Sequence, residues 1–109
     1  MPQFTEEQIL EIQEVLHTLL EATDHFILLV EQKELQQSVQ TLTTIVEGME
    51  SVFKVLKTSQ SDFHTQMKQI EKTLVTIGNL LEKGEMSAIP SIARDKLKAE
   101  IIQLTKTEI

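Results

Sequence analysis

The chain has 109 residues, of which 40% are hydrophobic, with a formal net charge of −7 and no Cys, Trp or Tyr. This length supports one continuous core, so we expect a single domain over residues 1–109. The missing cysteines exclude disulfide scaffolds, thiolate metal sites and thiol nucleophiles. With only three Gly and two Pro, the composition also argues against Gly-rich phosphate loops and turn-dense β-sandwiches. We therefore expect an all-α protein that is not an enzyme.

The charge is unevenly distributed along the chain. Residues 1–50 carry ten carboxylates and one cation, Lys33, for a net charge of −9, whereas residues 51–109 carry seven carboxylates and nine cations, for +2. The asymmetry favours docking of the acidic half on the basic half, either within one chain or between two; the alternative is a solvated acidic surface that keeps the protein soluble. The overall negative charge argues against a nucleic acid or a membrane surface as partner.

The first residues, MPQFTEE, lack the cationic and apolar regions of a signal peptide. The longest apolar run, residues 26–30, is five residues long, far below the roughly 20 that a spanning helix needs. We expect a cytoplasmic protein.

The first helix is predicted over residues 5–31. Thr5 and Gln8 have the spacing of a capping box, with two glutamates in the first turn where the helix dipole favours them. A break near Thr23 is the alternative to a break near Lys33, and the uninterrupted spacing favours the latter. The predicted face has steps of three and four residues, with Thr23 as its one polar member. It comprises Ile9, Ile12, Leu16, Leu19, Thr23, Phe26 and Val30.

The same three-four rhythm runs through the middle of the chain. A continuous helix from Leu35 to Glu82 would be about 70 Å long and would form a coiled-coil dimer. The alternative is a turn at Lys57–Ser61, which contains no apolar residue, between helices over 35–57 and 62–83. We favour the turn, because a hairpin buries both seams within one chain. The predicted seam, with Gln60 as its one polar member, is Leu35, Val39, Leu42, Val46, Met49, Phe53, Leu56, Gln60, Phe63, Met67, Ile70, Leu74, Ile77 and Leu81.

A last helix is predicted over residues 88–106. Gly84 ends the preceding helix, Ser87 is the expected N-cap, and Pro90 lies in the first turn, where its missing N–H costs little. Four helices of similar length with short connections predict an up-down-up-down four-helix bundle. The expected apolar face is Ile89, Ala93, Leu97, Ile101 and Leu104.

One group of side chains has the residue types of a metal site. His17, Glu21 and Asp24 lie at i, i+4 and i+7, and Glu14 completes a Glu-x-x-His pair with His17. Di-metal bundles need this pair from two helices and a further Glu from each of two others. The second pair is missing here, so we expect no metal and no cofactor, and His17, Glu21 and Asp24 are weak candidates.

The second helix carries an unusual polar stripe. Residues 35–46 contain no charge, and a row of uncharged side chains is offset from the apolar seam by about 200° around the helix. Exposed Thr and Gly are poor helix formers, so contact with a partner would explain them; the alternative is a solvent-facing surface that is not optimised for helix stability. The candidate interaction residues are Gln37, Thr41, Thr44, Gly48 and Ser51.

The expected function is a non-enzymatic helical protein-interaction module that associates with itself, as in a homodimer, or with another protein. In class and size alone, the chain looks like a small secretion-type chaperone or regulatory adaptor that holds a helical client. In that alternative, the helix behind Gly84 and Pro90 would swing away to open a groove. A second alternative is a metal-binding bundle using His17.

Overall fold

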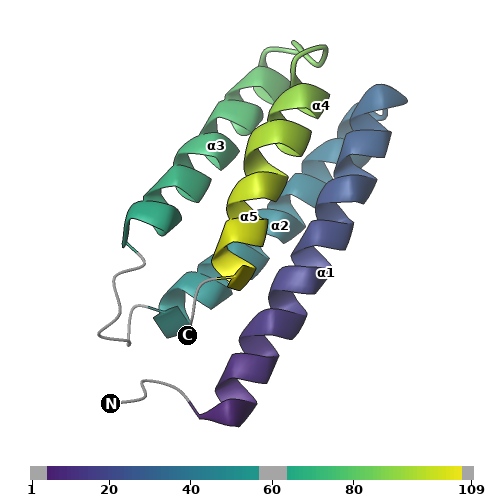
Figure 1. Ribbon diagram of the computed structural model, residues 1–109. Coiled ribbons are helices and arrows are strands. Elements are labelled where there is room, and N and C mark those ends of the chain that lie inside the picture. Colours follow the sequence, from purple (N-terminus) through teal and green to yellow (C-terminus); the bar gives the residue numbers. More distant parts are fainter. Residues whose placement is uncertain (1–4, 57–63, 107–109) are drawn as a thin grey trace.

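The computed structural model describes residues 5–56 and 64–106, which form four helices that alternate in direction (Figure 1). The fold is therefore all-α, an up-down-up-down helical bundle as predicted, with no strand in the two described ranges. The last helix is built from three consecutive segments. The elements are α1 (Glu6–Glu31), α2 (Leu35–Leu56), α3 (His64–Glu82), α4 (Ile89–Ile92), the π-helical segment η1 (Ala93–Leu97) and α5 (Lys98–Lys106).

Helix α1 begins with the predicted capping box. The Gln8 N–H donates to Thr5 Oγ1 at 3.1 Å, and the Thr5 N–H donates to Gln8 Oε1 at 3.0 Å. The helix then continues through Thr23, whose buried hydroxyl donates to the Leu19 carbonyl at 2.7 Å. A break near Thr23 is wrong, because this bond satisfies the hydroxyl inside a regular helix.

The turn between α1 and α2 is a Schellman motif, although it contains neither Gly nor Pro. The Glu34 N–H donates to the Leu29 carbonyl at 2.9 Å, and the Lys33 N–H donates to the Val30 carbonyl at 3.0 Å. Lys33 adopts φ 62°, the left-handed conformation that such a cap requires. The same type of cap ends α3, where Gly84 has φ 75°. The predicted break near Lys33 is confirmed.

Helices α2 and α3 are separate and antiparallel. A Cβ on Gly78 of α3 would lie 4.0 Å from Leu42 Cδ2 of α2, which places these two residues at the same level of the bundle. The alternative of one helix from Leu35 to Glu82 is wrong, because α2 and α3 pack against each other within one chain. The turn predicted at residues 57–61 lies outside the described residues.

The last helix begins one residue later than the Ser87 cap predicts. Its N-cap is Ala88, with no side-chain hydrogen bond. Further along, the Lys98 N–H donates to the Ala93 carbonyl five residues earlier, which is the π-helical pattern. In a straight α-helix, side chains spaced four residues apart shift by about 40° around the helix axis at each step. The π-helical turn has more residues per turn than an α-helical turn, so it compensates for this shift. Five residues stay fully buried on one face: Ile89, Ala93, Leu97, Ile101 and Leu104.

The buried face of α2 differs from the predicted seam. The helix is rotated so that Ser38, Ile45 and Val52 are buried, whereas Leu35 is 45% exposed and Val39 is 46% exposed. This rotation follows from an extensive packing of α2 against α1, whereas α2 and α3 touch over a smaller area. The apolar seam of α2 is therefore only partly covered on its α3 side.

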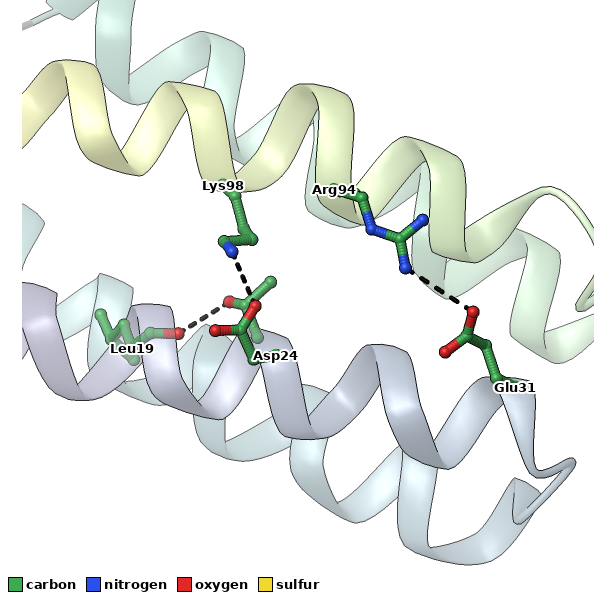
Figure 2. Close-up of polar contacts among 6 residues, drawn as sticks. Leu19, Asp24, Glu31, Arg94 and Lys98 are labelled. Atoms are coloured by element: carbon green, nitrogen blue, oxygen red, sulfur yellow. Dashed lines mark hydrogen bonds and ion pairs between the residues drawn. The ribbon is translucent and has the colours of Figure 1, made fainter.

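Two ion pairs join the acidic half of the chain to the basic half (Figure 2). Lys98 Nζ of the last helix lies 2.7 Å from Asp24 Oδ1 of α1, and Arg94 Nη2 lies 3.6 Å from Glu31 Oε2. Both contacts lie at the surface, so each contributes less than about 1 kcal/mol. The docking of the two halves that the charge distribution predicts thus takes place within one chain.

Candidate functional site

The uncharged stripe of α2 lies beside α1. A Cβ on Gly48 would be only 2.6 Å from Leu19 Cδ2, so Gly48 allows the two helices to approach closely. Thr41 is also half-buried. For these two residues the predicted position opposite the core is wrong, because α2 is rotated toward α1. The remaining stripe residues, Gln37, Thr44 and Ser51, are exposed.

The candidate metal ligands are dispersed on the outer surface of α1. His17, Glu21 and Asp24 are all exposed, and Asp24 forms the ion pair with Lys98 at 2.7 Å. Across residues 5–56 and 64–106, no three His, Asp or Glu side chains are grouped as a metal ion would require. The structure therefore does not bring the three weak candidates together into a ligand set.

A largely apolar groove lies between α2 and α3, where the bundle is least tightly closed. Its volume is about 430 Å³, and it is open to solvent along one side. Both walls are mainly aliphatic or aromatic, and each carries one carboxylate. We call it the α2–α3 groove; it is lined by Leu42, Val46, Met49, Glu50, Phe53, Glu71, Leu74, Val75 and Gly78.

The apolar surface at this groove is unusually exposed. Val75, on the α3 wall, is 61% exposed, and Val46 on the α2 wall is half-buried. Val39 and Leu35 lie on the apolar line of Val46, about two and three helical turns earlier, and are exposed as well. Contiguous apolar surface is uncommon on monomeric proteins and marks interaction sites when it is large. Sequence reasoning placed Leu35, Val39 and Val46 in the core and so did not identify this surface.

Two carboxylates face each other across the groove. Because Leu42 lies level with Gly78 in an antiparallel pair, Glu50 lies at the level of Glu71. Neither residue forms an ion pair with any other described residue, and the Glu50–Lys54 spacing of four does not produce one. The groove thus combines apolar walls with two carboxylates, and its lining contains no Lys or Arg. Lys54 and Lys68 lie about one helical turn away, along α2 and α3.

A second polar feature lies between α3 and the last helix. Burial raises the pKa of the Glu100 carboxyl above its ordinary value, and a hydrogen bond with Thr73 and the Lys96 charge oppose the rise. The Glu100 Oε1 atom is buried and accepts no hydrogen bond from the described residues. The folded state therefore favours the protonated Glu100 carboxyl, so this group makes the stability of the fold depend on pH.

None of the helices in the described ranges combines the length and the hydropathy needed to cross a bilayer. Comparison of the chain with protein-family models, with curated proteins and with solved structures found no match.

Proposed function

We propose that this chain is a helical protein-interaction module that binds an apolar helical segment in the α2–α3 groove. The observation that carries the proposal is a set of exposed or half-buried apolar side chains, Val39 and Val46 of α2 and Val75 of α3, at or next to a groove of about 430 Å³. Burying an exposed aliphatic side chain contributes about 1.5–3 kcal/mol, so a segment that covered Val39, Val46 and Val75 would gain substantial stabilisation. Small helical bundles commonly present such grooves to amphipathic helices.

The proposal includes two kinds of occupant. A second copy would make the module a homodimer, and a helical segment of another protein would make it an adaptor or a chaperone for that segment. The groove is accessible without displacing the last helix. Opening that helix as a latch would instead expose residues such as Ile89, Leu97 and Leu104, which are fully buried. Client binding at the groove is therefore favoured over a latch.

The proposal is tested with a pair of surface substitutions. Val75→Glu places a charge in the groove, whereas Leu28→Glu places the same charge on another exposed apolar residue, which lies on α1 and is 49% exposed. Neither residue is buried, so circular dichroism should show both variants folded. The uncharged dye Nile red reports apolar binding surface, and sedimentation equilibrium reports self-association.

We expect Nile red to bind the wild-type protein and Leu28→Glu with similar affinity, and to bind Val75→Glu at least about fivefold more weakly, since a carboxylate opposes transfer of the dye. Any self-association should be lost in the same variant only. The proposal is wrong if Val75→Glu and Leu28→Glu bind the dye equally, or if the wild-type protein neither binds it nor self-associates.

A further inference from the structure

We infer that the occupant of the α2–α3 groove is a basic amphipathic helix from another protein. This inference rests on the proposed function, because it takes the groove as the binding surface and adds the chemistry of the partner. Three observations carry it: the length of the groove, the two carboxylates on its walls, and the distribution of charge along α2 and α3.

The length of the groove suits a short helix. From Leu42 to Phe53 the α2 wall rises by about 17 Å, which equals about three helical turns. A helix of that length places apolar side chains at i, i+4, i+7 and i+11 along one face, and those side chains would contact Val46, Leu74 and Val75. The groove therefore takes the apolar face of a helix and leaves the flanks of that helix near its rims.

The carboxylates at the rims of the groove favour positively charged side chains on the flanks of the bound helix. Glu50 and Glu71 lie at one level on opposite walls, so a helix between them passes close to both carboxylates. Lys and Arg can lay their aliphatic stems on apolar walls while their charged ends reach carboxylates. The net charge of −7 attracts a basic partner over a longer range and repels an acidic one.

The groove lining contains no Lys or Arg, so a second copy packed through its own groove brings no lining cation to these carboxylates. If two copies pack in parallel through their grooves, Glu50 and Glu71 of both copies lie at one level, and four carboxylates meet. If they pack antiparallel, with the Val46 residues of the two copies at one level, residues that follow Val46 in one copy lie level with residues that precede it in the other. The carboxylates of each copy then lie at the level of Leu42 of the other copy. In the antiparallel arrangement these glutamates meet uncharged stretches, residues 35–46 of α2 and residues 73–81 of α3. In the parallel arrangement Lys54 and Lys68 of the other copy lie about one helical turn from the four carboxylates, outside the groove lining.

The test uses two fluorescein-labelled peptides of about 18 residues with leucines in identical helical positions. One carries Lys at the remaining positions and the other carries Glu. Fluorescence anisotropy gives the affinity of each for the full chain, and amide chemical shifts locate the binding surface. We expect the lysine peptide to bind, with shifts confined to α2 and α3, and the glutamate peptide to bind at least about tenfold more weakly.

A matched pair of charge variants separates local recognition from general attraction. Glu50→Gln with Glu71→Gln removes both groove carboxylates, whereas Glu14→Gln with Glu21→Gln removes the same net charge from the exposed surface of α1. We expect the groove variant to weaken binding of the lysine peptide by about two- to thirtyfold, the range of two exposed ion pairs. The α1 variant should change it by less than about twofold.

The outcomes distinguish this inference from the proposed function. Equal affinity for the two peptides, or equal effects of the two charge variants, overturns the choice of a basic helix and leaves the groove as an apolar binding surface. Self-association that Val75→Glu abolishes also overturns it, in favour of a second copy. Binding of neither peptide, together with a strict monomer and no Nile red binding, overturns the proposed function itself.

Discussion

The close approach of α1 and α2 at Gly48 makes a quantitative prediction when it is compared with Gly78. Both glycines lie inside helices, so replacing either with Ala should gain about 1 kcal/mol in helix propensity. Their surroundings differ: a Cβ at position 78 meets Leu42 Cδ2 at 4.0 Å, an ordinary contact, whereas a Cβ at position 48 meets Leu19 Cδ2 at 2.6 Å. We therefore expect Gly78→Ala to stabilise the fold by about 1 kcal/mol.

Gly48→Ala should not stabilise. Carbon atoms pack best about 3.5–4.0 Å apart, so the Leu19 methyl must retreat by about 1 Å. Leu19 is buried, and overpacking a core of this kind costs about 1–3 kcal/mol. Set against the propensity gain, the net effect runs from about zero to 2 kcal/mol of destabilisation. The two alanine variants should thus differ by about 1–3 kcal/mol.

Urea unfolding followed by far-UV circular dichroism measures this difference, since the chain has no Trp or Tyr to report by fluorescence. Leu19→Ala provides the internal control. Leu19→Ala should destabilise the Gly48→Ala variant less than it destabilises the wild type. In that variant, removing the Leu19 side chain also removes the crowding, and the methyl introduced at position 48 fills part of the cavity that is left. Equal stabilisation by Gly48→Ala and Gly78→Ala would show that the close helix approach is absent.

Three further predictions concern the turn, the pH dependence and the ion pairs. Lys33→Gly should stabilise the fold by about 0.5–1 kcal/mol, because Gly adopts a positive φ without steric cost, and an unchanged or lower melting temperature would refute this. Burial raises the pKa of Glu100 in the folded state, so the folded protein holds that proton more tightly than the unfolded chain does. The free energy of unfolding therefore falls as the pH rises from the unfolded-state pKa of this carboxyl through its folded-state pKa. Glu100→Gln should therefore raise the melting temperature at about pH 7 and leave it nearly unchanged at about pH 3.5, and the opposite pattern would contradict the assignment. A double-mutant cycle of Asp24→Ala and Lys98→Ala should give a coupling of about 0.2–1 kcal/mol that declines with added salt, and a salt-independent coupling would argue against an exposed ion pair.

Much of the fold follows from local signals in the sequence. The capping box at Thr5 and the periodic apolar face locate α1, and Gly84 locates the end of α3, because these features depend on residues a few positions apart. Ser87 was a misleading signal: its side chain could have capped the last helix, but the helix begins after Ala88 instead. The turn at Lys33 has no Gly, so only the shift in apolar spacing indicated it.

The candidate site could not be found in the same way. Apolar spacing identifies the residues that can be buried, but the rotation of α2 depends on its competing contacts with α1 and α3. Packing of Gly48 on Leu19 turns α2 toward α1, which leaves Val46 in the wall of the groove and Val39 exposed. One signal was present in the sequence: Ile45 and Val52 lie beside the predicted seam and widen the apolar arc of α2 beyond what one neighbouring helix covers.

The π-helical turn at Ala93–Leu97 has a consequence for the length of the last helix. The buried residues from Ile89 to Leu104 are spaced by four, four, four and three, which is a regular heptad pattern with one extra residue. Deleting one of the exposed residues 94–96 would restore alternating steps of four and three and permit an unbroken α-helix. A deletion elsewhere in the helix would rotate the residues beyond it by about 100° and move them off the core. The chain can therefore lose a residue at this turn without losing the alignment of its last helix.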